Sequence, residues 1–263
     1  MKTILLINDD GIESLGLITL KKKLEKLGEV VVVAPRKERS GIGKAITSSG
    51  YVKIIEKRLK DGSEAYAASG TPADAVLLAL NKILNHPPDL LVAGVNLGPN
   101  LGIDDMLNSG TLGAALEAAI HGVPAVAVSY CKREFIDQHA DKAKITEENL
   151  EFTVKFAQKI VEYVLKNGMP QNVDIISINV PENADRKKLK VTNLSYVGYG
   201  DIWTEEKEGY RIASWKLADY EDSNSETDIH VVKEGYISVT PIKVRLLHNR
   251  DALESMIKDI QFE

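Results

Sequence analysis

Cysteine is almost absent from this chain: among its 263 residues, only Cys131 is a cysteine. A single cysteine cannot form an internal disulfide, and Cys131 has no cysteine or histidine neighbour at the spacing of a metal site. The sequence therefore excludes small disulfide-stabilised secreted folds and favours a reducing compartment.

Long hydrophobic runs are lacking too. At the N-terminus, residues 4–7 form an apolar run of only four residues before Asn8, which is too short for the hydrophobic region of a signal peptide. No other stretch approaches the roughly 20 apolar residues that a membrane span needs. We expect a cytoplasmic protein without a membrane partner.

Positive charge is not in excess. The 33 lysines and arginines face 38 aspartates and glutamates, so the formal net charge is −5. Without a long basic run, the chain lacks the electrostatic footprint of a protein dedicated to nucleic-acid polymers or membrane surfaces. Its 44% hydrophobic and 27% charged residues are typical of a globular protein. The length fits one domain, alone or with a small appendage, and small ligands are the expected partners.

Several motifs of nucleotide enzymes are missing. The nearest match to a P-loop, residues 41–44, has Glu38 in place of the first glycine and Ala45 in place of Ser or Thr. The turn after the first expected strand lacks the GxGxxG pattern, and His86 and His121 stand at positions typical of local structural roles. The sequence therefore supports neither P-loop ATP hydrolysis, nor dinucleotide redox chemistry, nor a Ser-His-Asp nucleophile.

What the chain does contain is an alternation of buried strand and helix patterns. The four consecutive valines within 29–34 follow an expected helix, as in a parallel strand covered on both faces. We expect strands at 3–7, 29–34, 51–59, 64–68, 89–95, 125–129 and 173–180, and helices at 15–27, 71–84, 111–121 and 147–166. This order predicts an α/β fold with a doubly wound, mostly parallel, Rossmann-like sheet.

The character of the sequence changes near Asn183. Short alternating segments at 201–203 and 210–216, around Glu208-Gly209, predict an exposed β-hairpin. A strand at 237–242 and a terminal helix at 253–260 are expected to follow. We therefore divide the chain into a Rossmann-like core, 1–182, and a C-terminal hairpin, strand and helix region, 183–263, that completes the fold.

Polar residues gather where the expected strands end, and ligands of open α/β sheets bind at that edge. Asp9 and Asp10 follow the first strand, and their paired carboxylates predict a divalent cation that offsets their repulsion. The Ser40 hydroxyl and the Asn96 amide oxygen complete an all-oxygen set that favours Mg²⁺ or Mn²⁺ over zinc. The alternative is that Asp9 and Asp10 only cap the next helix and start a turn.

Two further segments belong to the same edge. Residues 94–102 are rich in glycine and asparagine, which predicts either close backbone approach to a ligand or a series of turns. Ser109, Gly110 and Thr111 then open an alanine-rich helix, whose free N–H groups and positive end suit phosphate. An ordinary Ser/Thr N-cap would have the same sequence there, as it would at Thr71.

Taken in order, these motifs resemble the SurE family of survival-protein phosphatases. The resemblance is carried by the segments 8–11, 39–41, 69–74, 94–102, 109–111, 227–228 and 235–241. It implies a metal-dependent 5'-nucleotidase, a phosphoric monoester hydrolase that converts nucleoside monophosphates to nucleosides and phosphate. Broader phosphomonoesterase activity, and exopolyphosphatase activity in some members, are also implied.

Carried over by position, the resemblance implies one metal ion per subunit, bound by Asp9, Asp10, Ser40 and Asn96. It implies phosphate contacts from Asn100, Ser109, Gly110 and Thr111. It also implies a homodimer or homotetramer, with oligomer contacts from the C-terminal region. Asn108 and Ala75 depart from the residues frequent in the family, an aromatic residue and a cysteine, which leaves the preferred base open.

The mechanism that we expect is attack of a metal-bound water on phosphorus, with Asp9 or Asp10 accepting its proton. Two alternatives remain. An aspartyl-phosphate phosphatase would use Asp9 as nucleophile, but it requires Asp-x-Asp and position 11 is Gly11. A receiver-like phosphoacceptor module also has paired acids, but it needs an aspartate after a later strand, where this chain has Asn96.

Overall fold

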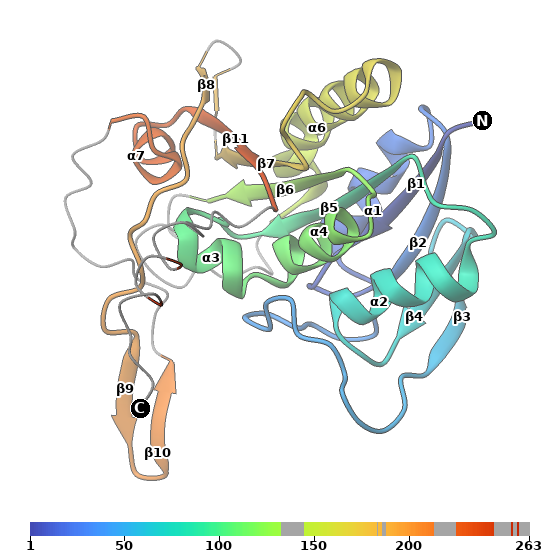
Figure 1. Cartoon of the computed structure of the whole chain (residues 1–263), viewed down its shortest axis with the longest axis horizontal. Helices are drawn as coiled ribbons and strands as arrows, with labels where there is room; N and C mark the ends of the chain where they lie inside the picture. The colour runs from blue at the N-terminus through green and yellow to red at the C-terminus, as the bar shows by residue number, and fades with distance from the viewer. Residues whose placement is uncertain are drawn as a thin grey trace.

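A computed structural model describes residues 1–132, 145–182, 184–185, 188–212, 225–244, 254 and 257. Its central element is a nine-stranded sheet in the order β3-β4-β2-β1-β5-β6-β7-β11-β8, with helices on both faces (Figure 1). The sheet strands are β1 (Thr3–Ile7), β2 (Glu29–Pro35), β3 (Ile54–Arg58), β4 (Glu64–Ala68), β5 (Leu90–Leu97), β6 (Ala125–Cys131), β7 (Ile175–Pro181), β8 (Leu189–Val191) and β11 (Ile237–Ile242).

The pairing confirms the predicted doubly wound, mostly parallel sheet. Strands β4, β2, β1, β5, β6 and β7 are parallel to their neighbours, while β3 pairs antiparallel with β4 and β11 pairs antiparallel with β7. The chain winds outward from β1 to β2 and then returns to β5 on the other side of β1. The carboxyl ends of β1 and β5 therefore flank the switch point, where open α/β sheets bind ligands.

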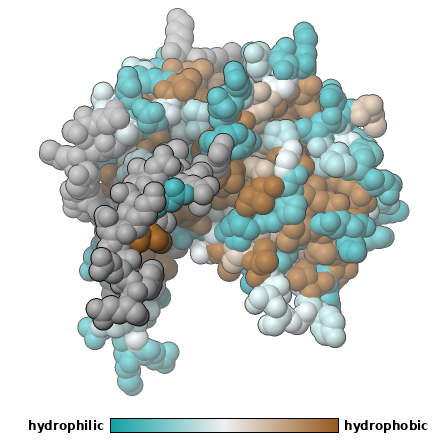
Figure 2. Space-filling view, in the orientation of Figure 1, coloured by the Kyte–Doolittle hydropathy of each residue, from teal (hydrophilic) through white to brown (hydrophobic). Residues whose placement is uncertain are grey.

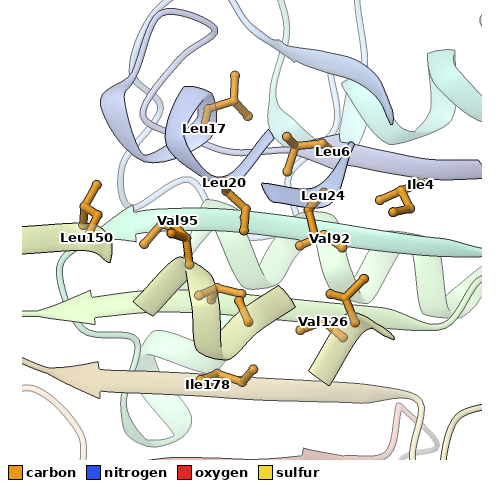
Figure 3. Packing of buried hydrophobic residues seen from close by; sticks show 14 of the residues in the cluster. Ile4, Leu6, Leu17, Leu20, Leu24, Val92, Val95, Val126, Leu150 and Ile178 are labelled. Carbon is orange, nitrogen blue, oxygen red and sulfur yellow. The ribbon is translucent and has the colours of Figure 1, made fainter. Parts of the chain in front are cut away.

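Four helices cover the sheet: α1 (Leu15–Leu24), α2 (Pro72–Leu78), α4 (Gly110–Ile120) and α6 (Glu147–Asn167). Helices α1 and α6 pack together on one face, and Figure 3 shows Leu20 and Leu24 of α1 beside Val92 and Val95 of β5. Helices α2 and α4 pack together on the other face. Side chains on both faces of the central strands are buried, as a parallel sheet between two helix layers requires.

One predicted helix start, that of α2, is confirmed by its cap. Thr71 caps α2 in a capping box with Asp74, with Pro72 at the first helical position. The same carboxylate accepts hydrogen bonds from the backbone and hydroxyl of Thr47, so it also holds the long loop after β2. The helix expected to reach residue 84 ends in a π-helical turn, η1 (Ala79–Ile83). Thr71 thus has the structural role that the sequence left as one of two alternatives.

The C-terminal region extends the main sheet instead of forming a separate layer. Strand β11 lies between β7 and β8, so residues after 183 continue the sheet built by the first 182. The predicted hairpin is confirmed as β9 (Trp203–Glu206) and β10 (Gly209–Ile212), which project away from the sheet (Figure 1). Residues 213–216 of its expected second strand lie outside the described residues, as does nearly all of the expected helix 253–260.

Three described elements were not expected from the sequence. They are β8, α3 (Gly102–Asn108) and α7 (Asp228–Lys233), each seven residues or shorter. Short elements carry too little periodicity for a sequence pattern to identify them.

The surface view in Figure 2 shows hydrophobic and hydrophilic residues intermixed over the body of the molecule, with a hydrophilic hairpin tip. No helix within the described residues is long and apolar enough to cross a membrane.

Candidate active site at the carboxyl edge of the sheet

Asp9 is the point at which three segments meet. It follows β1 and is only 4% exposed. Its Oδ1 accepts a hydrogen bond from the Thr111 hydroxyl in the first turn of α4, and its backbone carbonyl accepts one from the Arg39 N–H at 2.7 Å. The end of β1, the loop after β2 and the start of α4 therefore converge on one residue, the loop at its backbone carbonyl and the helix at its carboxylate.

Gly110 makes this close approach possible. A Cβ atom at position 110 would lie 2.7 Å from the Asp9 Cβ, 3.0 Å from Asp9 Oδ2 and 3.2 Å from the Arg39 carbonyl oxygen. Since no side chain fits there without displacing Asp9, glycine is required to bring the helix N-terminus against the carboxylate.

Asp10 and Asn96 lie across β1 and β5. The Asp10 Oδ2 accepts a hydrogen bond from the Leu97 N–H at 3.2 Å, which ties the residue after Asn96 to the end of β1. The Asn96 side chain donates its Nδ2 to the Gly98 carbonyl at 2.8 Å. That bond fixes the orientation of the carboxamide, and Oδ1, the atom that would ligate a metal, has no hydrogen-bond partner among the described residues.

The β5 backbone is irregular just before Asn96. Its pairing with β6 shifts register between Ala93 and Asn96. Such a shift interrupts the regular alternation of side chains along the strand just before Asn96.

Ser40 lies on the loop after β2 and is exposed. Its hydroxyl donates to Glu38 Oε1 at 2.6 Å, and its neighbour Arg39 is the residue bonded to the Asp9 carbonyl. Farther along, this loop is held against α4: the Gly43 N–H donates to the Asn108 carbonyl at 2.7 Å, and Lys44 forms an ion pair with a buried glutamate of α4, Glu117. The structure thus places Ser40 one residue from a direct contact of Asp9.

The start of α4 combines a cap with unused donors. The Ser109 Oγ accepts a hydrogen bond from the Leu112 N–H at 3.2 Å, which confirms Ser109 as an N-cap. Among the described residues, the N–H groups of Gly110 and Thr111 have no acceptor. These two donors and the positive end of an 11-residue helix lie beside Asp9, so this corner can hold an anion such as phosphate.

Asn100 takes part in an internal network that sequence analysis did not foresee. Its backbone N–H and C=O both bond the Asn179 side chain on β7, each at 2.9 Å, and its Nδ2 donates to Ser129 Oγ on β6 at 2.8 Å. Asn100 and Asn179 are buried, 6% and 0% exposed. The predicted contact of Asn100 with phosphate stays a prediction, because the bonds that the structure gives it are to protein.

Two carboxylates beside this network were also missed as site residues. Asp105 on α3 accepts hydrogen bonds from the Leu101 N–H at 2.8 Å and from the Tyr199 hydroxyl. Asp228 on α7 accepts from the Gly102 N–H at 2.8 Å. Thr227 and Asp228 belong to the segments that carry the family resemblance, but nothing in the sequence indicates which segment the Asp228 carboxylate binds.

Burial perturbs both carboxylates. Desolvation raises the pKa of Asp105 to about 6, with smaller contributions from the Asp228 and Asp104 charges, while the Tyr199 hydrogen bond opposes the shift. Desolvation likewise raises the pKa of Asp228, against the effect of its backbone N–H donors. The thiol of Cys131 is buried nearby, and its pKa is raised by the same cause, so the single cysteine is an inert core residue.

The donor set of the candidate metal site contains few charged groups. Within the described part of the chain, no cluster of three or more His, Cys, Asp or Glu side chains could hold a metal ion. A cation at Asp9 and Asp10 would therefore depend on neutral oxygens such as those of Ser40 and Asn96. Hard, oxygen-preferring ions such as Mg²⁺ and Mn²⁺ fit this chemistry, and zinc does not.

Comparisons with known proteins agree with this architecture. The family described as "Survival protein SurE" matches residues 4–201. The chain is 35% identical over 258 residues to a protein of Methanobrevibacter smithii named 5'-nucleotidase SurE, covering 97% of this chain and 99% of that protein. It is 40% identical over 195 residues to a protein of the same name from Methanothermobacter thermautotrophicus, covering 73% and 72% of the two chains.

A solved structure has the same fold. The crystal structure of the SurE protein from Aquifex aeolicus superposes with a TM-score of 0.75 at 33% identity, and the match covers 98% of this chain and all of that chain. The family match spans most of the chain, and the sequence and structural relatives extend over nearly all of it. The chain belongs to the SurE family.

Proposed function

We propose that this chain is a metal-dependent 5'-nucleotidase that hydrolyses nucleoside monophosphates to nucleosides and phosphate. The observation that carries the proposal is the junction at Asp9, where a candidate metal ligand touches a helix N-terminus with unused N–H donors. A metal ion and a phosphate group can then be held side by side. Relatives that bear the name 5'-nucleotidase SurE support the reaction class.

The metal in this proposal is one Mg²⁺ or Mn²⁺ ion per subunit, held by Asp9, Asp10, Ser40 and Asn96. The orientation of the Asn96 carboxamide supports its assignment, because its nitrogen is engaged by Gly98 and its oxygen is not. When bound, such an ion neutralises phosphate charge and lowers the pKa of water at the site.

Residues of this chain would bind the phosphate group and accept the proton of the attacking water. The N–H groups of Gly110 and Thr111 would hold the nonbridging phosphate oxygens, with Ser109 and Asn100 at the border of the same subsite. Asp9 or Asp10 would accept the proton of the attacking water. The hydroxyl of Thr111 donates to Asp9 and so orients its carboxylate.

The chain is also proposed to act as a homodimer or homotetramer. Large side chains are exposed on the projecting hairpin, with Trp203 53% and Tyr210 70% accessible, which supports a contact there. Light scattering of the purified protein would measure the mass of the assembly, and a monomer at micromolar concentration would contradict this part of the proposal.

Phosphate release tests the function directly. Nucleoside 5'- and 3'-monophosphates, an aryl phosphate and polyphosphate are each incubated with Mg²⁺, Mn²⁺ or EDTA. We expect metal-dependent release from 5'-monophosphates and a fall of at least about 100-fold in Asp9→Asn, because a charged group at the reacting centre is lost.

The matched control is Asp89→Asn. Asp89 is another carboxylate bonded within the protein, in its case to the Thr3 N–H, but it lies at the opposite end of the sheet. Its variant should keep full activity. Equal turnover of wild type and Asp9→Asn, or release that EDTA does not suppress, would overturn the proposed mechanism.

A further inference from the structure

The segment that crosses from Asn96 toward α4 has no unused backbone donor. This crossing segment (residues 97–103) passes over the carboxyl ends of β6 and β7. Each of its N–H groups donates to a protein acceptor, as follows: Leu97 to Asp10 Oδ2, Gly98 to the Tyr130 carbonyl, Asn100 to Asn179 Oδ1, Leu101 to Asp105 Oδ2, Gly102 to Asp228 Oδ2 and Ile103 to the Ser195 carbonyl, while Pro99 has no N–H. So complete a set of bonds fixes the path of the segment.

The acceptors come from parts of the chain far from the segment in sequence. Asn179 is 79 residues away and Asp228 is 126 residues away from the backbone groups that they bind. Both are buried, 0% and 1% exposed. Burying an amide and a carboxylate is costly unless their hydrogen bonds are made, so these contacts are specific.

Each of the two side chains forms hydrogen bonds with more than one backbone group. The Asn179 carboxamide pairs with both the N–H and the C=O of Asn100, as a neighbouring strand would. Asp228 accepts from Gly102 with Oδ2, and from Ser195 and Ile229 with Oδ1. Asp228 therefore joins the crossing segment to the C-terminal region through a single carboxylate.

The crossing segment has functional residues at both ends. It begins directly after Asn96, the candidate metal ligand, and leads through α3 to Ser109 and the phosphate corner at Gly110. We propose that Asn179 and Asp228 are positioning residues of the hydrolytic reaction, which hold this segment so that the metal ligand and the phosphate donors keep their relative placement. The inference builds on the proposed function and assigns part of the positioning to the C-terminal region.

Two variants remove these hydrogen bonds to the crossing segment while preserving the shape of the side chain. Asn179→Leu keeps the side-chain branching and leaves both backbone groups of Asn100 without partners. Asp228→Asn keeps one acceptor oxygen, which satisfies Ser195 and Ile229, and turns its amino group toward the Gly102 N–H. The control is Thr192→Val, which breaks a buried hydroxyl cluster with Ser238 and Thr240 near the same strands without touching the crossing segment.

Three measurements separate positioning from plain stability. In the metal-free protein, hydrogen exchange of the Asn100 amide in Asn179→Leu and of the Gly102 amide in Asp228→Asn should accelerate at least about tenfold, because each of these amides loses its acceptor. Titration with MnCl₂ should show affinity reduced by about 10- to 100-fold, the usual effect of losing a group that orients a ligand. With a nucleoside monophosphate, kcat should fall by a similar factor while KM changes little.

The control variant distinguishes a positioning role from a general loss of stability. Thr192→Val should lower the melting temperature and leave Mn²⁺ affinity, segment exchange and kcat at wild-type values. The proposal is overturned if Asn179→Leu and Asp228→Asn behave like this control. If the wild type binds Mn²⁺ but releases no phosphate, the proposed function fails, whereas exchange and Mn²⁺ affinity still decide whether the two residues position the site.

Discussion

The crossing segment and the first turn of α4 are close in sequence and each contains two glycines, yet their backbone N–H groups differ in whether they are bonded within the protein. Every N–H of residues 97–103 is bonded within the protein, while the N–H groups of Gly110 and Thr111 have no acceptor among the described residues. The first region is a fixed support and the second can receive an anion. Composition does not separate these roles, but an account of the hydrogen-bond acceptors does.

The largest expected effect of a substitution at this junction is that of Gly110→Ala. The new methyl group would meet the Asp9 Cβ at 2.7 Å, so the carboxylate or the helix must move. A displacement of about 1 Å at a reacting centre costs on the order of 100-fold in rate, and we expect kcat/KM to fall by that factor.

The control for this variant is Gly122→Ala at the other end of the same helix. Gly122 has a positive φ of 78° and no atom within 4 Å of an added Cβ. Its variant should lose about 1 kcal/mol of stability from backbone strain and keep its activity. If both variants had equal activity, the contact between α4 and Asp9 would have no catalytic consequence.

A smaller effect is expected for Thr111→Val, which keeps the shape and removes the hydroxyl that donates to Asp9. We expect Mn²⁺ affinity and kcat/KM to fall about tenfold, since the hydroxyl orients the carboxylate. Steady-state kinetics and metal titration would measure this. Thr19→Val is the matched change, because the Thr19 hydroxyl is buried in α1 without a described partner, and it should alter neither quantity.

The role of Ser109 can be tested by comparing the loss of its helix cap with the loss of the cap at Thr146. Ser109→Ala at α4 and Thr146→Ala at α6 each remove an N-cap and should each lower the unfolding free energy by about 1 kcal/mol. Urea denaturation measures that shared loss. A decrease in phosphatase activity confined to Ser109→Ala would support the assignment of Ser109 to the phosphate subsite. Equal activity in the two variants would contradict that assignment.

The smallest expected effect is on the pH dependence of stability, through Asp105. This residue bonds both the crossing segment and the start of α4: its carboxylate accepts from the Leu101 N–H, and its backbone carbonyl accepts from the Ser109 N–H. Its pKa is raised from 3.8 to about 6 in the folded chain. Between these values the folded state binds more protons than the unfolded state, so this group makes stability fall as pH rises from about 4 to 6.

Comparison of unfolding free energies at pH 4.5 and 7.5 tests this sign. In Asp105→Asn the difference between the two pH values should shrink by no more than about 1 kcal/mol, because one pKa unit corresponds to about 1.4 kcal/mol and the residue is partly exposed. A pH dependence identical to that of the wild type would show that Asp105 titrates normally.

Much of the fold follows from local sequence patterns. The valine run of β2, the Asp-Gly turn between β3 and β4, and the Thr71-Pro72 helix start each specify their own local structure, and all three are confirmed. Asp9, Asp10 and Asn96 could be selected as candidates because residues just after parallel strands reach one edge. What the sequence could not show is that Thr111 donates to Asp9, since the two are 102 residues apart.

The sequence by itself determined the strand and helix order, the location of the ligand edge and the family to which this chain belongs. These depend on periodicity, on turn chemistry and on motifs that are each contained within a few residues. Only the tertiary structure decided which polar groups of that edge are free for a ligand and which are bonded within the protein. Hydrogen bonds such as those of Asn179 and Asp228 join segments from distant parts of the chain, so they form only once the sheet has placed those segments together.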